Sequence, residues 1–127
     1  MRAYDVAVVA LAIDAPRKWI DNLLSQHQLA EVLSIRQGVA RRVSYSALVR
    51  LGVIRQLHVE LGIGVGDAVR IAARILDSGT SSGLEVGQLK LTLDVDALRQ
   101  RLDHRLAIAI ESAPSPRRGR PARKPAP

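Results

Sequence analysis

From Asp5 to Gln26 the chain reads DVAVVALAIDAPRKWIDNLLSQ, and this stretch decides the fold. Residues 6–12 are almost wholly apolar, which predicts a short buried helix capped by Asp5. Asp14 is a good N-cap and Pro16 fits a first helical turn, so a second helix is predicted to run to about Gln26. Two helices separated by only two or three residues have the spacing of a helix-turn-helix.

The residues that follow predict a basic hairpin. Between residues 29 and 43 the helical period is lost, and Gly38 supplies a turn between two stretches of strand. Arg36, Arg41 and Arg42 are expected around the tip and on the return strand. The register of the hairpin stays open at this point.

Two further helices are predicted after the hairpin. Ser44 is the expected N-cap of a long helix that stops near Gly62. Residues 64–67 restart the chain, and a short amphipathic helix is predicted over residues 68–76. The long helix has an apolar face that comprises Leu48, Leu51, Ile54, Leu57 and Leu61.

The last part of the chain predicts a linker, a strand and a helix. Residues 77–83 have the composition of a flexible linker, and residues 88–95 alternate polar and apolar side chains like a strand. Asp96 is the expected cap of a helix over residues 97–112. Its apolar positions are Leu98, Leu102, Leu106, Ile108 and Ile110.

Composition excludes several classes of protein. The 127 residues are 47% hydrophobic, which favours one domain plus a tail, but they include no Phe, one Trp and two Tyr. Few aromatic side chains weaken the case for a flat organic ligand and for single-strand binding by base stacking. The absence of Cys excludes disulfides and thiolate metal sites. With no signal-peptide pattern and no apolar run near the ~20 residues of a membrane span, a cytoplasmic protein is expected.

An enzyme is not expected, and neither a cofactor nor a metal is predicted. The chain has no nucleophile elbow, no phosphate-loop motif and no acids and histidines at metal-ligand spacing. Trp19 is interpreted as a packing residue. His27, His58 and His104 are interpreted as incidental, and Arg50, Arg55, Arg70 and Arg74 as a solvated helix face.

The net charge of +7 is unevenly distributed along the chain. Residues 1–74 hold ten Lys/Arg and six acids, residues 75–111 hold four and six, and residues 112–127 hold five and none. Two basic segments therefore flank an acidic one. This pattern favours contact with DNA by the first segment and the tail, with a different role for the middle.

The order of elements and several motifs resemble the MerR-type winged helix and its excisionase-like members. Ala15-Pro16-Arg17 stands where that family opens its second helix, and Lys18-Trp19-Ile20 is similar to a motif of excisionase-like relatives. Residues 38–44 resemble the end of the family's wing, and residues 61–67 resemble the end of its long helix. The resemblance covers roughly residues 4–76 and implies a winged helix-turn-helix.

The chain also departs from this family. Ala40 and Val43 stand where aromatics usually surround the wing arginines. The Gly that often closes the second helix is absent near His27. A strand and a helix replace the long C-terminal dimer helix of effector-sensing members. With no Cys as well, a small-molecule or metal effector is not expected.

The resemblance implies a mainly α chain of the α+β class, with a winged helix-turn-helix and a basic β-hairpin wing. The expected units are a DNA-binding domain at 1–77, a linker at 78–83, a strand–helix segment at 84–112 and a disordered basic tail at 113–127. Arg17, Lys18 and Asn22 or Asp21 are the candidates for reading bases in the major groove. Arg36, Arg41 and Arg42 are better suited to phosphates or the minor groove.

The tail carries a second resemblance to DNA-binding segments. Arg118-Gly119-Arg120-Pro121, with basic residues on both sides, resembles the AT-hook of A·T-rich minor grooves. Pro121 stiffens an extended backbone, Gly119 permits close approach, and the arginines suit a narrow, negative groove. The alternative is a basic tail that only solubilises the protein or attracts polyanions loosely.

These features predict a sequence-specific protein for double-stranded DNA, cytoplasmic and associated with the nucleoid, that regulates transcription. The alternatives are an excisionase-like or nucleoid factor that bends DNA, and an antitoxin-like or adaptor module that binds a protein. A homodimer through residues 84–111 is also expected, because a lone strand needs a partner edge. The alternative for that strand is pairing with the wing of its own chain.

Overall fold

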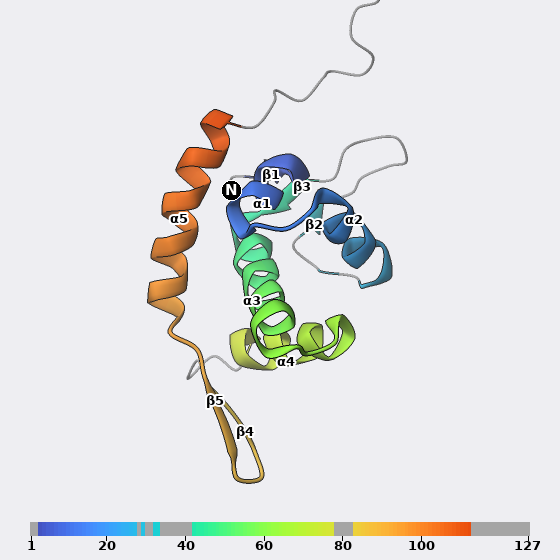
Figure 1. Cartoon of the computed structure of the whole chain (residues 1–127), viewed down its shortest axis with the longest axis vertical. Coiled ribbons are helices and arrows are strands. Elements are labelled where there is room, and N and C mark those ends of the chain that lie inside the picture. Colours follow the sequence, from blue (N-terminus) through green and yellow to red (C-terminus); the bar gives the residue numbers. More distant parts are fainter. Residues whose placement is uncertain (1–2, 28, 30–31, 34–41, 78–82, 113–127) are drawn as a thin grey trace, which may run out of the picture.

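A computed structural model describes residues 3–27, 29, 32–33, 42–77 and 83–112. The described chain is mainly helical, with small antiparallel strand pairs, and α3 lies centrally between the other helices (Figure 1). The elements are β1 (Ala3–Asp5), α1 (Val6–Ile13), α2 (Arg17–Gln26), β2 (Val32–Leu33), β3 (Arg42–Ser44), α3 (Tyr45–Leu61), α4 (Val65–Asp77), β4 (Gly83–Val86), β5 (Leu89–Thr92) and α5 (Val95–Ser112).

The first two helices are confirmed, but their caps differ from the prediction. Asp14 does not cap α2; it ends α1 in the left-handed region at φ 57°, and its N–H donates to the Ala10 carbonyl. Pro16 is the N-cap of α2, and no side chain bonds there. The turn requires one residue with positive φ, which Asp tolerates better than most side chains. Asp5 precedes α1 without a capping hydrogen bond.

The predicted hairpin exists at its base and belongs to a larger sheet. β2 and β3 are antiparallel, with Val32 opposite Val43, while the tip at residues 34–41, with Gly38, lies outside the described residues. β1 was not predicted. It pairs with the other side of β3, with Tyr4 opposite Val43, so the strand order is β1-β3-β2. The buried Val43 thus lies in the central strand, between Tyr4 of β1 and Val32 of β2.

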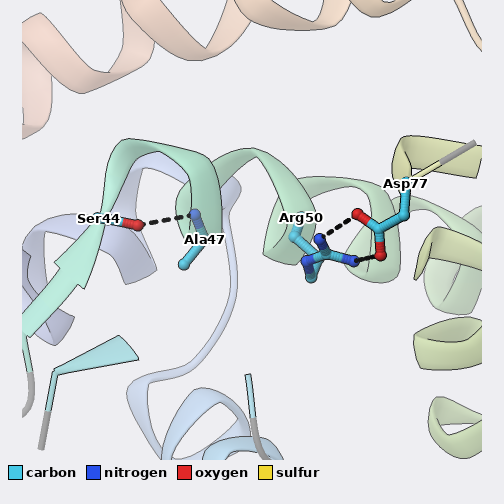
Figure 2. Close-up of polar contacts among 4 residues, drawn as sticks. All are labelled: Ser44, Ala47, Arg50 and Asp77. Carbon is cyan, nitrogen blue, oxygen red and sulfur yellow. Dashed lines mark hydrogen bonds and ion pairs between the residues drawn. The ribbon is translucent and has the colours of Figure 1, made fainter. Parts of the chain in front are cut away.

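The ends of α3 are as predicted. The Ser44 hydroxyl accepts a hydrogen bond from the Ala47 N–H at 3.1 Å (Figure 2), and Gly62 ends the helix at φ 68°. Four of the five predicted apolar positions are buried, but Leu61 is 58% exposed. Leu61 is the last helical residue, and the reversal at Gly62 lets Ile63 pack against the core in its place.

α4 is confirmed as an amphipathic helix that packs against α3. Its buried residues are Ala68, Ala72 and Ile75. Its last residue, Asp77, receives two hydrogen bonds from the Arg50 guanidinium, at 2.8 and 3.3 Å (Figure 2). This contact lowers the pKa of Asp77. The predicted linker after Asp77 lies largely outside the described residues, which resume at Gly83.

The strand predicted over residues 88–95 is shorter and is not alone. It is β5, and it pairs within its own chain with β4, which was not predicted. Gly87 has φ 59° in the two-residue turn between them, a conformation that Gly adopts without strain. The premise of a lone strand was therefore wrong, and among the described strands β5 does not pair with the wing strands β2 and β3. The hairpin projects beyond the helices at one end of the molecule (Figure 1).

α5 lies along α1 and α3 and begins earlier than predicted. Asp94, not Asp96, is its cap, because the Asp94 carboxylate accepts from the Ala97 N–H at 3.0 Å. The Tyr45 hydroxyl donates to the Asp103 carboxylate at 2.7 Å and ties α5 to the start of α3. Burial first, and then this hydrogen bond, raise the pKa of Tyr45 to about 12.

The apolar face of α5 also differs from the prediction. Ile108 and Ile110 are 53% and 43% exposed. The buried stripe is Leu98, Leu102, Leu106 and Ala109. These positions follow the three- and four-residue spacing of one helix face, which places the two isoleucines to its sides. Gly52 of α3 permits the close contact, because a Cβ there would lie 3.3 Å from Leu102.

Replacing Leu102 with Ala should test the packing of α5 on its own chain. The side chain is 3% exposed, so truncation should cost about 2–4 kcal/mol of the free energy of unfolding in urea. Ile108→Ala is the matched control on the same helix and should cost less than about 1 kcal/mol. Equal losses for the two variants would contradict this placement of α5.

The ion pair between Arg50 and Asp77 should show a defined pH dependence. Because the pKa of Asp77 is lowered from 3.8 in the folded chain, its stabilising effect is present above that value and is lost as pH falls through the lowered pKa. Asp77 is 59% exposed, so a double-mutant cycle with Arg50→Gln and Asp77→Asn should give a coupling of at most about 1 kcal/mol at neutral pH. Coupling that persists in acid would exclude this ion pair as its source.

Candidate nucleic-acid interface

The candidate contact residues of α2 lie together on its exposed side. Arg17, Lys18 and Asn22 are exposed, whereas Ile20 and Leu23 are buried in the core. At 100° per residue, the three polar side chains fall within one arc, opposite the two buried ones. The structure therefore brings together all three major-groove candidates of α2. Asp21, the other residue considered, is half-buried beside them.

The start of α2 is electrostatically suited to an anion. Arg17 and Lys18 are its first two residues, and its first turn holds no acid. The free N–H groups of a helix N-terminus and its dipole favour negative charge at the same end. Pro16, just before them, is exposed, so this end of the helix is open to solvent. A phosphate at this position would meet two cations and a favourable dipole.

Arg42, the wing arginine that the structure describes, already has partners in the protein. Its guanidinium donates to the Ala3 carbonyl at 3.0 Å and forms an ion pair with Asp5 at 3.4 Å. These contacts hold β1 against β3. The side chain stays 49% exposed, so one side of it faces solvent. Arg36 and Arg41 lie outside the described residues, as do Arg118, Gly119, Arg120 and Pro121 of the tail.

Trp19 is the centre of a cluster that joins α2 to α3. Its ring is half-buried and stacks on the ring of His58, with centroids 6.0 Å apart at 28°. The Arg55 guanidinium lies 4.9 Å from the Trp19 ring centroid. His58 Nδ1 lies 2.8 Å from the Ile63 carbonyl, which makes Nδ1 the donor of a hydrogen bond to the turn before α4. The back of α2 is thus tied to α3 and to that turn.

This cluster corrects part of the sequence interpretation. Trp19 is a packing residue, as predicted, but His58 is not incidental, and neither Arg50 nor Arg55 belongs to a solvated face. Arg50 is 11% exposed and pairs with Asp77. No pattern along the sequence signals contacts between residues almost 40 positions apart. The one signal in the sequence that pointed to this cluster was the single Trp of a chain with few aromatic residues. A side chain of this size is usually packed against other residues.

The other described elements do not add to the candidate surface on α2. α5 lies on the opposite side of α1 and α3 from α2 (Figure 1), so its arginines do not extend the α2 surface. Within the described ranges no three His, Asp or Glu side chains gather closely enough to bind a metal ion. No helix in the same ranges has the length and apolar character needed to cross a lipid bilayer.

None of the family models, curated proteins and solved structures with which the chain was compared matches it.

Replacing Arg42 with Gln should separate its structural contacts from any role in DNA binding. We expect a loss of about 0.5–1 kcal/mol in the free energy of unfolding, because β1 loses its hydrogen bond at Ala3 and its ion pair. Arg17→Gln removes the same charge from an exposed side chain and should change stability by less than about 0.5 kcal/mol. Unchanged stability in Arg42→Gln would show that its contacts to β1 contribute nothing.

Proposed function

We propose that this protein binds specific sequences of double-stranded DNA and regulates transcription. It would do so in the cytoplasm, in association with the nucleoid. The observation that carries the proposal is the exposed group of Arg17, Lys18 and Asn22 on α2, a helix whose opposite side is fixed in the core. Arg can bind guanine with two hydrogen bonds and Asn can bind adenine likewise. These residue types on a firmly held helix suit the reading of bases.

The arrangement of elements supports a winged helix-turn-helix for this role. α1 and α2 are separated by three residues, a β2–β3 pair follows, and α3 and α4 come next, in the order that the MerR-type resemblance implies. The turn is tight, since the Ala15 N–H still donates to the Ala10 carbonyl at 2.9 Å. In such an arrangement α2 enters the major groove and the wing, with Arg36, Arg41 and the free side of Arg42, contacts the backbone.

A homodimer through residues 84–111 remains part of the proposal. The argument for it is now the exposed hairpin β4–β5 and not a lone strand. The β4–β5 sheet has only two strands in the described chain, so each strand has an edge without a neighbour. Val86 and Leu89 face each other in its register and are 53% and 75% exposed. An isolated two-stranded hairpin is marginal in water, and a second copy would cover these side chains and bring two α2 helices to one DNA.

The DNA-binding proposal is tested by selecting duplexes from a random pool and titrating the full chain against the best one by fluorescence anisotropy. Arg17→Ala should weaken binding by about 1–3 kcal/mol and relax preference at one base pair. A chain that ends at Pro114 should instead bind most duplexes less tightly, with a salt slope flatter by up to about five units. Arg99 is exposed on α5, so Arg99→Ala is the control. This variant should bind the selected duplex with the affinity of the unaltered chain.

Three outcomes would each contradict a part of the proposal. Failure to bind any duplex in about 50 mM salt would exclude DNA binding, because counterion release favours it most there. Tight binding with little preference among duplexes would favour the architectural alternative. An unchanged salt slope after removal of the tail would exclude a role for Arg118 and Arg120 at phosphates.

The dimer proposal is tested by Leu89→Lys in the full chain. A charge at this position should shift the monomer–dimer equilibrium toward monomer at least about tenfold, as measured by sedimentation equilibrium, because burying it unpaired is costly. Gln88→Lys adds the same charge in the adjacent turn and should have a smaller effect. A monomeric unaltered chain at sub-millimolar concentration, free or on DNA, would refute the dimer.

A further inference from the structure

A cleft of about 130 Å³ lies between the end of α1, the middle of α3 and the first half of α5. Its lining includes three buried apolar side chains, Ile13, Leu98 and Leu102, beside charged ones. Gly52 also lines it, at the point where Leu102 approaches α3 closely. The cleft is open to solvent on one side and is distinct from the exposed surface of α2. Its lining therefore combines apolar side chains with charged groups.

Three arginines from two helices line this cleft. Arg55 of α3 and Arg101 and Arg105 of α5 all line it. Elsewhere in the described chain, Arg42, Arg50 and Arg70 each form an ion pair with a carboxylate. The three arginines of the cleft have no carboxylate within 4 Å among the described residues, so none of them is held in an ion pair with a described carboxylate.

Two acids line the same cleft and limit the ligands that fit. Asp14 and Glu60 contribute carboxylates to its lining, but neither forms an ion pair with the arginines in the described structure. The net charge of the lining is therefore +1. Such a site favours a ligand with a single anionic group over one with several. The apolar side chains of the lining favour a ligand whose remaining atoms are hydrocarbon.

Arg55 connects this cleft to α2. Its guanidinium lies over the Trp19 ring at 4.9 Å and its side chain also lines the cleft. An oxyanion binds a guanidinium through two parallel hydrogen bonds, whereas the face of an indole offers a weaker attraction. An anion in the cleft would therefore compete with Trp19 for Arg55. Trp19 immediately follows Arg17 and Lys18 in α2. A displacement of its ring would therefore shift the backbone that carries these two candidate DNA-reading side chains.

We propose that this cleft binds a small organic carboxylate with an apolar body, and that Arg55 transmits its presence to α2 through Trp19. The planar carboxylate fits the guanidinium fork, and the hydrocarbon part packs against the apolar side chains of the lining. This proposal departs from the sequence-based expectation of no small-molecule effector. That expectation rested on the absence of Cys and of the long C-terminal dimer helix of effector-sensing relatives, whereas the scarcity of aromatic residues disfavours only flat ligands. Neither argument addresses an aliphatic carboxylate in a cleft between α1, α3 and α5.

The single Trp of the chain makes the proposal directly testable. The full chain, without DNA, is titrated with hexanoate while the emission of Trp19 is recorded at constant ionic strength. Hexanol has the same body without the charge, and inorganic phosphate has the charge without the body. We expect a saturable change in emission with hexanoate, none with hexanol, and a weaker response to phosphate. A phosphate response stronger than that of hexanoate would overturn the choice of carboxylate.

Variants locate the site and separate it from DNA binding. Arg101→Gln combined with Arg105→Gln should weaken hexanoate binding at least about tenfold, with far-ultraviolet circular dichroism as the check on folding. Arg99→Gln, on the same helix but outside the cleft, should leave it unchanged. Unweakened binding by the double variant, or no saturable response in the millimolar range, would refute the site. Thermal stabilisation by hexanoate without a change in Trp19 emission would refute the link through Arg55.

Discussion

The burial of α1 is the constraint on which the rest of this structure depends. All eight of its residues are apolar, and such a helix needs cover from its neighbours. Val6, Val9, Ala12 and Ile13 are buried, whereas Leu11 is 47% exposed. It is covered by α5 on one side and by α2, α3 and the β1–β3 pair on others. Its small Ala and Val side chains allow these neighbours to approach closely. Three of the other helices, α2, α3 and α5, therefore pack against the shortest one, while α4 packs against α3.

This arrangement gives α5 a structural part in the same core. Leu98, Leu102 and Leu106 belong to one hydrophobic cluster with Val9 of α1 and Leu51 of α3. Removing the C-terminal helix would expose the side of α1 that it covers. Large apolar side chains of the described chain remain exposed on α1, at the end of α3, at the hairpin tip and on α5: Leu11, Val59, Leu61, Val86, Leu89, Ile108 and Ile110. The inner face of α5 is already occupied, so the proposed dimer would use the hairpin and not this face.

The same packing determines how the candidate DNA surface is held. Ile20 and Leu23 anchor α2 in the core, and Trp19 adds a stack with His58 and a contact with Arg55. The exposed Arg17 and Lys18 therefore project from a helix fixed along its back. Arg55 lies between this contact and the arginine-lined cleft at α5. The proposed DNA-reading surface and the proposed carboxylate site are in this way connected through one side chain, Arg55.

The sequence by itself determined the helices, because apolar periodicity, Ser44 and Gly62 are local signals that act over a few residues. It also selected Arg17, Lys18 and Asn22 correctly as exposed, since their neighbours at helical spacing are apolar. β1 and β4 were missed because each is only three or four residues long and gains its stability from a partner strand. The roles of Arg42, Arg55 and His58 were decided by tertiary structure alone. Their partners lie 5 to 39 positions away, and they come within contact distance only because β1 pairs with β3 and because α2 and the turn before α4 lie beside α3.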